Sequence, residues 1–322
     1  MPFSDGCGRV GSFVLVALAV AILHPGLTWQ TPTVNRTVLQ RPKPLSCGRN
    51  VGSVQRWAEP TVATGPTVTT GRRKAGSLGI GLVAGGLGGA LGLGGGFLVV
   101  PALNSLMGLE PRKSIGTSSF VVLATSASAV CSYIYEGLTS FRAAAAIGVT
   151  AMVSARIGAT MTNKVKPKTL KKGFGAWLMI VSVLIFAKAM KLLPVTSSVS
   201  HAGATAAIFP LSAVGIASGM ISGLLGVGGG TVLVPVLALF FAFPQSEAQG
   251  SALLAMLFPS VVSTSTHWSK GNVDRELVAF AILGALLGGF LGGSIAAILP
   301  ERALRMIFAA VLSMVAVKYI RS

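Results

Sequence analysis

The sequence predicts an all-α, polytopic membrane protein with about eight transmembrane helices in two repeats of about four, each with a glycine-interrupted helix. Three observations carry this prediction. Only 11% of the 322 residues are charged and 52% are hydrophobic, whereas a soluble domain carries about a quarter charged residues. The charges are clustered, and the stretches between clusters reach the roughly 20 apolar residues that a transmembrane helix needs. The phrase GLGGGFLVVP at 92–101 recurs as GVGGGTVLVP at 226–235.

Residues 1–76 have the character of a targeting segment. The apolar stretch at 13–23 is short for a span and is typical of a signal peptide, so we assign residues 1–23 to one. Residues 24–76 contain one acid, Glu59, and are typical of a transit peptide or a disordered segment. Together they resemble the bipartite presequence that directs proteins to a plastid membrane. The alternative is a plain signal peptide with a lumenal tail, which would place the protein in the plasma membrane or an endomembrane.

From Gly76 onward, charge clusters separate the predicted spans. An offset of 134 positions, from Gly92 to Gly226, aligns glycines and prolines in the two halves. It divides the chain into a first membrane repeat, a linker and a second repeat, over 77–193, 194–203 and 204–322. The predicted spans are 77–107, 115–135, 141–161, 173–193, 205–240, 248–268, 277–298 and 303–320, of which the first and fifth are broken by glycines.

The two glycine triplets predict a helix break that binds an anion. Glycine inside a helix costs about 1 kcal/mol relative to alanine, so three in a row are expected to unwind a span. Unwound backbone cannot face lipid, and a proline-containing helix restarts after each triplet, with free N–H groups that attract anions. Breaks at matching positions in two repeats indicate a binding site between the repeats. The candidate substrate-binding residues here are Gly94, Gly95, Gly96, Pro101, Gly228, Gly229, Gly230 and Pro235.

Other glycines fit a packing role. Gly284, Gly288 and Gly292 have four-residue spacing but no triplet and no helix restart, so we expect them to allow close contact between helices. The triplets could serve packing as well. A dinucleotide-binding loop is excluded, because GLGGGF lacks the last glycine of that fingerprint and follows no strand.

Four further residues are candidates for substrate contact. Thr117, Ser118 and Ser251 open the second span of each repeat, where their hydroxyls could bind an anion or cap and pack the helix. Since TSS in the first half corresponds to SAL in the second, the first half is expected to supply more polar contact. Arg156 lies within the third span and could attract an anion or extend to the membrane surface. His267, near the end of the sixth span, is expected to anchor the helix at that surface, or to titrate in proton-coupled transport.

The duplicated pattern G-x-G-G-G-x-x-x-x-P, each copy followed about fifteen residues later by glycine and a hydroxyl residue, resembles the TauE/SafE family of sulfite and organosulfonate exporters. The resemblance covers residues 78–320. It implies about eight helices, no cofactor, and transport of a small sulfur-containing anion, without fixing which one.

The remaining features bound the function. The net charge of +18 is typical of loops that face anionic lipid rather than of nucleic-acid binding. No carboxylate falls inside a predicted span, and HExxH and GxSxG motifs are absent, so we expect neither an intramembrane enzyme nor a cation site. The sequence therefore predicts a secondary transporter that exports a small anion, sulfite or an organosulfonate, by alternating access. The alternative is a structural or assembly membrane protein whose glycines serve helix packing.

Overall fold

The computed structural model describes residues 70–162, 167–190 and 208–321. The predicted signal peptide, most of the transit-like segment and the 194–203 linker lie outside these residues. The described helices are α2 (Thr70–Leu91), α3 (Gly96–Met107), α4 (Pro111–Tyr135), α5 (Phe141–Met161), α6 (Pro167–Ala189), α7 (Ile208–Leu225), α8 (Gly230–Phe240), α9 (Gln245–Ser269), α10 (Arg275–Ile298) and α11 (Glu301–Arg321).

The predicted fold class is confirmed. The described residues form helices and no strand, and eight of the helices have 18 to 25 residues. The other two, α3 and α8, have 12 and 11 residues and follow the glycine triplets. By length and composition, α2 (from Arg73), α4, α5 and α10 are each able to cross a bilayer. Because α2 begins at Thr70, the first membrane helix includes residues 70–76, which the sequence assigned to the targeting segment.

The two repeats run in opposite directions. Tyr133, near the end of α4, contacts Gly89 near the end of α2, and His267, near the end of α9, contacts Gly223 near the end of α7. Both pairs are therefore parallel. By contrast, α4 and α9 are antiparallel, since Gly116 at the start of α4 lies against the end of α9. It follows that α2 and its counterpart α7 are antiparallel, and the repeats have inverted topology.

Inversion follows from the way the broken segment folds. The Arg73 guanidinium, near the start of α2, donates a hydrogen bond to the carbonyl of Met107 at the end of α3 (3.3 Å). The segment therefore turns at the glycines and returns to the side from which it came, where α4 begins. One such hairpin followed by three crossing helices leaves the chain on the opposite side, so the second repeat starts there.

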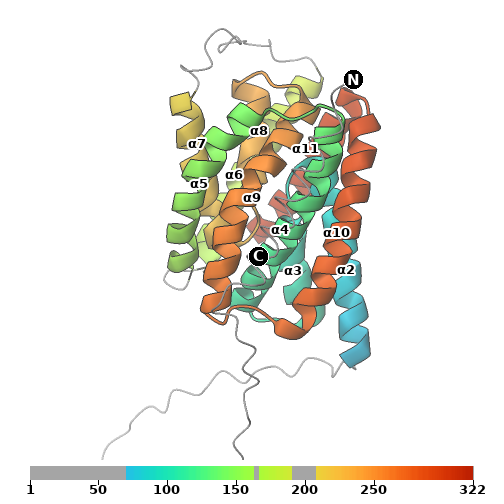
Figure 1. Cartoon of the computed structure of the whole chain (residues 1–322), viewed down its shortest axis with the longest axis vertical. Coiled ribbons are helices and arrows are strands. Elements are labelled where there is room, and N and C mark those ends of the chain that lie inside the picture. The colour runs from blue at the N-terminus through green and yellow to red at the C-terminus, as the bar shows by residue number, and fades with distance from the viewer. Residues whose placement is uncertain (1–69, 163–166, 191–207, 322) are drawn as a thin grey trace, which may run out of the picture.

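Glycines allow the first helix of each repeat to contact the third span of the other repeat. An added Cβ at Gly85 would lie 2.7 Å from the carbonyl oxygen of Ala285, and Gly219 on α7 meets the backbone of Ala151 in the same way. Figure 1 shows these parallel pairs, α2 with α10 and α5 with α7, at opposite edges of the bundle. Gly284, Gly288 and Gly292 on α10 lie against the backbone of α2. Their predicted role in helix packing is therefore confirmed.

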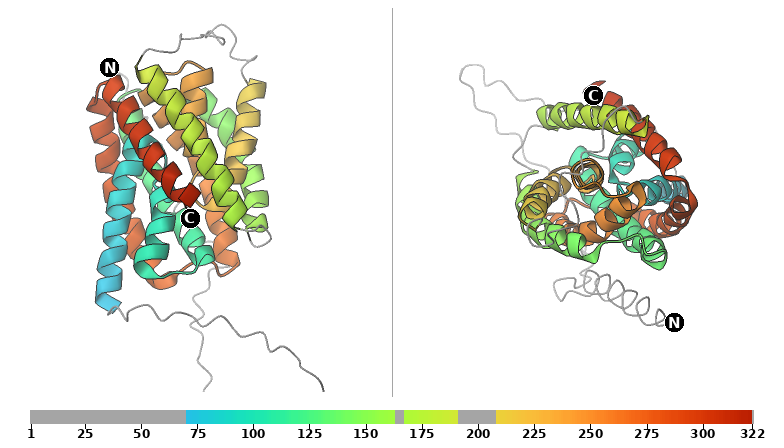
Figure 2. Two further views of the ribbon diagram at one scale, coloured as in Figure 1. Left: turned by 180° about the vertical axis from the view of Figure 1, so that it is seen from behind. Right: turned by 90° about the horizontal axis from the view of Figure 1, so that it is seen from above.

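The remaining helices surround this framework. α4 and α9 occupy the centre, and α4 is largely buried. α6 and α11 lie side by side on one face (Figure 2), where the Ser182 hydroxyl donates to the Ala309 carbonyl (2.9 Å). Large apolar side chains such as Val153 and Leu287 are exposed on the outer helices, as expected of a surface that faces lipid. The polar backbone of the two breaks lies inside this shell.

Candidate functional site

The first break lies between α2 and α3, at residues 92–95. Its three glycines have φ between 71° and 78°, a left-handed conformation that costs other residues about 1–2 kcal/mol. The Gly88 carbonyl accepts a hydrogen bond from the Leu93 N–H (2.9 Å), so the chain turns back along α2. An added Cβ at Gly95 would lie 2.5 Å from the Ala84 carbonyl oxygen. The start of α3 is therefore level with Ala84, about two turns before α2 ends.

The second break lies between α7 and α8, at residues 226–229. Gly226 and Gly228 again have positive φ, 61° and 85°. Gly229, the counterpart of Gly95, instead has φ −72°, which any residue adopts. An added Cβ there would lie 2.9 Å from the Ser218 hydroxyl. Both predicted interruptions are thus present, but their backbones differ at this one position.

The two breaks lie against each other. An added Cβ at Gly96, the first residue of α3, would lie 2.5 Å from the Gly226 carbonyl oxygen. Gly230, the first residue of α8, lies against the carbonyl of Gly92 in the same way. The two helix starts therefore meet at the interface of the repeats, as the sequence predicted, and in this conformation they meet backbone to backbone.

Two further side chains lie at the point where the breaks meet. Val122 on α4 and Met256 on α9 correspond at the 134-residue offset. The Met256 methyl group is 2.6 Å from the Cβ position of both Gly94 and Gly228, and the nearest Val122 carbon is 3.0 and 3.1 Å away. These two apolar side chains fill the space between the breaks, so any space for a ligand lies beside them.

Polar side chains satisfy the carbonyls where α2 and α7 end. The Tyr133 hydroxyl lies within hydrogen-bond distance of the Gly89 (3.2 Å) and Ala90 (3.1 Å) carbonyls. His267 is the counterpart of Tyr133, and its Nε2 is 3.2 Å from the Gly223 carbonyl. The expectation that His267 anchors the helix at the membrane surface is wrong, because its side chain is fully buried. Its role is to bind the last turn of α7, whose carbonyls have no partner within the helix.

A small space lies beside the second break, too narrow in this conformation to hold a water molecule. Serine hydroxyls from both repeats surround it, contributed by α4, α7 and α9. Its lining residues are Ser119, Val122, Ser222, Gly226, Gly228, Ser260 and Ser263.

One of these hydroxyls has no hydrogen-bond partner. The Ser260 Oγ is buried and unpaired, and so is that of Ser126, its counterpart on α4. The Ser126 Oγ lies 3.4 Å from the Cβ position of Gly94. Leaving a buried hydroxyl unpaired costs about 1–3 kcal/mol, so unpaired hydroxyls at both breaks indicate positions where a ligand could bind. The sequence reasoning missed both, although the repeat offset aligns them as serines in matching spans.

The three predicted hydroxyl residues make structural contacts. Thr117 Oγ1 accepts a hydrogen bond from the Asp274 N–H (3.1 Å), and Ser251 Oγ accepts one from the Ser140 N–H (2.8 Å). These equivalent contacts join each second span to the start of a third-span helix, α10 for Thr117 and α5 for Ser251. Ser118 is different, because its hydroxyl donates to the Gly226 carbonyl (2.6 Å) and so binds the second break directly. The extra hydroxyls of the first half thus contact the break of the second half.

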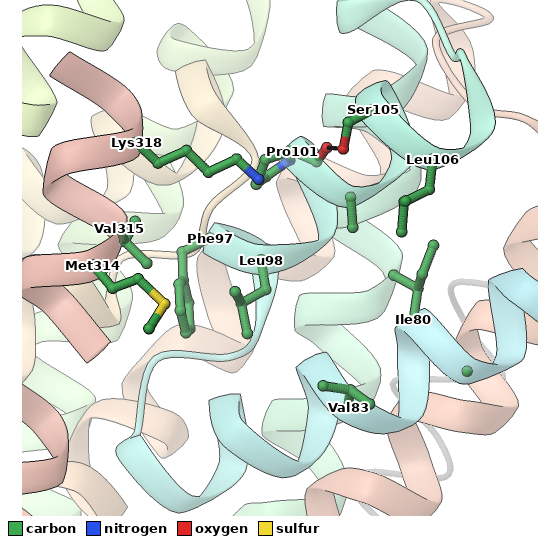
Figure 3. Close-up of a pocket in the computed structure, with 12 residues that line it drawn as sticks. Ile80, Val83, Phe97, Leu98, Pro101, Ser105, Leu106, Met314, Val315 and Lys318 are labelled. Carbon is green, nitrogen blue, oxygen red and sulfur yellow. Dashed lines mark hydrogen bonds between the residues drawn. The ribbon is translucent and has the colours of Figure 1, made fainter. Parts of the chain in front are cut away.

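Arg156 and the two prolines are not gathered at the breaks. Arg156 is exposed on the outer face of α5 beside the exposed Ile157. Pro235 is buried within α8. Pro101 borders an apolar cavity of about 480 Å³ between α2, α3 and α11 (Figure 3), in which Lys318 extends toward the proline. Phe97 also lines it, and the lining is mostly apolar, which suits hydrocarbon better than a small anion.

Metal ligands do not cluster in the described ranges. Within residues 70–162, 167–190 and 208–321, no group of three His, Cys, Asp or Glu side chains is positioned to hold a metal ion. The polar groups available at the breaks are backbone N–H and carbonyl groups, serine hydroxyls and, at the first break, the Tyr133 hydroxyl and the Gln249 amide. These groups hydrogen-bond to ligands without performing covalent chemistry.

Comparison with known proteins gives a family match over most of the chain. The model of the family described as "Sulfite exporter TauE/SafE" matches residues 9–185 and 211–322. The match reaches further toward the N-terminus than the resemblance seen at residues 78–320. No solved structure matches the chain.

Individual relatives are membrane transporters by name. "Probable membrane transporter protein YunE" of Bacillus subtilis is 27% identical over 214 residues, which cover 61% of this chain and 78% of the relative. "Probable membrane transporter protein MJ0441" of Methanocaldococcus jannaschii is 30% identical over 50% of this chain and 60% of its own length. "Sulfite exporter TauE/SafE family protein 1" of Arabidopsis thaliana is 34% identical over 27% of this chain and 19% of its own length.

Proposed function

The chain belongs to the sulfite exporter TauE/SafE family of membrane transporters, and from that premise we propose that it exports a small anion, sulfite or an organosulfonate, by alternating access. The observation that carries the proposal is the meeting of two half-helix starts, from α3 and α8, at the interface of inverted repeats. In transporters with inverted repeats, substrates bind where interrupted helices meet, and helix N-termini face anionic groups.

The closed arrangement of the breaks supports alternating access. With the breaks in contact and Val122 and Met256 between them, neither side has an open path to the serine-lined space. Rocking of the two repeats against each other would separate the breaks on one side at a time. The four helices at the two edges are held together by glycine contacts, so α2 with α10 and α5 with α7 would each move as a rigid pair.

The charge environment agrees with an anionic substrate. The acidic residues lie at helix ends: Glu110 and Glu136 cap α4, and Glu247, Glu276 and Glu301 lie in the first turns of α9, α10 and α11. A carboxylate near the breaks would repel an anion, whereas hydroxyls and N–H groups attract one. The name of the Arabidopsis relative supports sulfite as the first anion to test.

Flux through reconstituted protein tests this proposal. Purified protein in liposomes is expected to release preloaded sulfite or an organosulfonate faster than empty liposomes do. Gly95→Leu and Gly229→Leu should each abolish that flux, because a leucine at either position displaces a break. The Gly229 variant, whose φ of −72° any residue adopts, should still reach the membrane. Gly137→Leu is the control for Gly95, since Gly137 also has positive φ but no atoms within contact distance of an added Cβ.

The alternative, a structural or assembly protein, predicts another outcome. If the glycines served packing alone, Gly229→Leu would lower accumulation in the membrane, and liposomes with the wild-type protein would show no flux of any tested anion. The observation that favours this reading in part is the glycine packing along α2 and α10. That packing lies on the α10 side of α2, whereas Gly95 contacts α2 at Ala84, and it is compatible with transport.

We also propose a plastid membrane as the location, from the two-part character of residues 1–76. A fluorescent protein fused after Ser322 should appear at the plastid envelope. Deleting residues 24–69 should divert it to the endomembrane system while leaving the signal-like segment in place. Fluorescence at the plasma membrane in the full-length fusion would contradict the proposal.

A further inference from the structure

We propose that the anion binds at the second break alone, on uncharged serine hydroxyls, and that this site takes singly charged oxyanions in preference to doubly charged ones. The inference rests on the proposed function and deepens it. It starts from the difference between the surroundings of the two breaks.

Of the four serine hydroxyls beside the second break, two are hydrogen-bonded to each other and one has no partner. Ser119 on α4 and Ser263 on α9 are hydrogen-bonded to each other (Oγ to Oγ, 3.2 Å), and Ser119 also reaches the Ile115 carbonyl (3.1 Å). Ser260 lies one turn before Ser263 on the same face of α9, is 1% exposed and has no partner. A hydroxyl can rotate to donate its hydrogen to an anion. Ser260 therefore offers a donor without the loss of an existing bond.

A helix start adds backbone donors to the same place. Gly226 and Gly228, which line the space, immediately precede α8, an 11-residue helix that begins at Gly230. The first N–H groups of a helix have no partner within it and carry the positive end of its dipole. An anion in this space would meet hydroxyls from α4, α7 and α9 together with the start of α8, so it would be bound by both repeats at once.

The first break lacks this set. At the 134-residue offset, Ser119 corresponds to Leu253, Ser263 to Ala129 and Ser222 to Gly88. Only the unpaired serine is common to both, as Ser126 and Ser260. Around the first break the further polar side chains are Gln249, which lies against Gly92, and Tyr133, whose hydroxyl donates to the Gln249 amide oxygen (3.1 Å). The two breaks thus share a backbone, but the serine cluster lies beside the second break alone.

The donors are uncharged, and this limits the charge of the ligand. None of the residues that line the space is ionisable. The cost of removing an ion from water grows with the square of its charge, so a dianion costs about four times as much as a monoanion of the same size. Because no cationic side chain lines the space, hydrogen bonds alone must offset the cost of removing the anion from water. They offset this cost more readily for a monoanion than for a dianion. Hydrogen sulfite and organosulfonates carry one charge, whereas fully ionised sulfite and sulfate carry two.

Two ionisable groups lie near the second break without lining it. His267, one turn after Ser263, faces the end of α7 through its contact with Gly223. Lys270 extends from the end of α9 to the Ala159 carbonyl (3.3 Å). A change in the protonation of either side chain would alter the transport of all anions alike. A substrate whose own charge does not change with pH therefore reports the effect of the protein's titration alone.

The first test compares two serine variants in liposomes. Ser260→Ala should raise the KM for methanesulfonate roughly tenfold, which is the loss of one hydrogen bond to a charged ligand, while Ser126→Ala should change it less than about twofold. Each variant removes a hydroxyl with no partner, so neither is expected to lose stability, and thermal unfolding checks this. If Ser126→Ala raises the KM as much as Ser260→Ala does, or if neither does, the second break is not the site.

The second test varies the charge of the substrate. Between mildly acidic and mildly alkaline buffer, sulfite transport should fall relative to methanesulfonate transport as hydrogen sulfite is deprotonated, and sulfate should not be transported. Sulfate flux equal to methanesulfonate flux, or an equal pH effect on methanesulfonate and sulfite, would overturn the charge preference. Absence of flux for all three anions would instead contradict the proposed function itself.

Discussion

The two helix breaks are built on one plan and have diverged in their surroundings. Each turns the chain at glycines with positive φ, each is followed by a short helix with a proline at its sixth position, and each lies against the other. Around the first break, Leu253 and Ala129 occupy the positions that Ser119 and Ser263 hold around the second. Backbone geometry is therefore kept by both repeats, whereas the serine cluster lies beside one break.

This difference indicates two separate tasks. The backbone plan is required by the fold, since a hairpin in each repeat is what inverts the second repeat relative to the first. The serine cluster is not required by the fold, because the first break is stable without it. We infer that the serine cluster serves to bind a ligand. Substitutions at positions where the two repeats agree, and at positions where they differ, test this inference.

The largest effect is expected where the halves are most alike, at the glycines of α2 and α7. Gly85→Leu and Gly219→Leu should each cost at least about 3 kcal/mol of unfolding free energy, because the side chain would push two helix backbones apart. The measure is thermal unfolding and accumulation in the membrane. Gly79→Leu on the same helix meets open space and should be tolerated. A large loss from one substitution of the pair alone would contradict the inverted-repeat packing.

A smaller and unequal effect is expected at Gly95 and Gly229. Gly95→Ala should cost about 2–4 kcal/mol, since alanine would have to adopt φ 78° and would collide with the Ala84 carbonyl. Gly229→Ala should cost about 1 kcal/mol, because φ is already −72° and only Ser218 has to shift. Gly137→Ala measures the loss of unfolding free energy caused by positive φ alone, because an added Cβ at Gly137 contacts no other atom. Equal unfolding temperatures for the first two variants would show that the breaks do not differ as described.

Removal of the hydroxyl that binds the end of α2 is expected to have a moderate effect. Tyr133→Phe should lower stability by about 1–3 kcal/mol, because the carbonyls of Gly89 and Ala90 and the Gln249 amide oxygen would lose a buried donor. Tyr135→Phe, at an 82% exposed position on the same helix, should have no measurable effect. Chemical denaturation in detergent compares the two, and similar values would refute the capping role.

The smallest effect is expected at Arg156. Arg156→Gln should leave the KM for the transported anion unchanged and alter stability by less than about 0.5 kcal/mol, because the side chain is exposed on the outer face of α5. The same flux assay in liposomes measures it, with Ser260→Ala as the variant that should respond. A rise in KM for Arg156→Gln but not for Ser260→Ala would show that Arg156, rather than Ser260, contributes to anion binding.

Sequence reasoning predicted the helices and the breaks well because their causes are local. Apolar stretches between charges mark helices such as α5 and α10, and consecutive glycines interrupt a helix wherever they occur. The return of α3 toward the start of α2 was not predicted, since it depends on the contact of Arg73 with Met107 across the hairpin. The burial of His267 was missed for a related reason, because its partner is a carbonyl on α7, 44 residues away in the chain.

The candidate site shows the same limit. Gly94 and Gly228 are visible in the sequence because their pattern is rare, but a serine in an apolar span has many possible roles. Thr117 and Ser251 were chosen for their place at the start of a span, and they bind backbone N–H groups there. Only the three-dimensional arrangement shows that Ser260 lies at a break with its hydroxyl unpaired.

The most direct test of the central claim is ligand protection of single cysteines. In a background with Cys7, Cys47 and Cys131 replaced by serine, Ser260→Cys and Ser126→Cys would each be treated with a small thiol-reactive reagent, with and without methanesulfonate. Because the space is closed in this conformation, labelling reports its opening. Methanesulfonate should slow labelling at position 260 and leave labelling at position 126 unchanged. Equal protection at both positions, or protection at neither, would contradict binding at the second break.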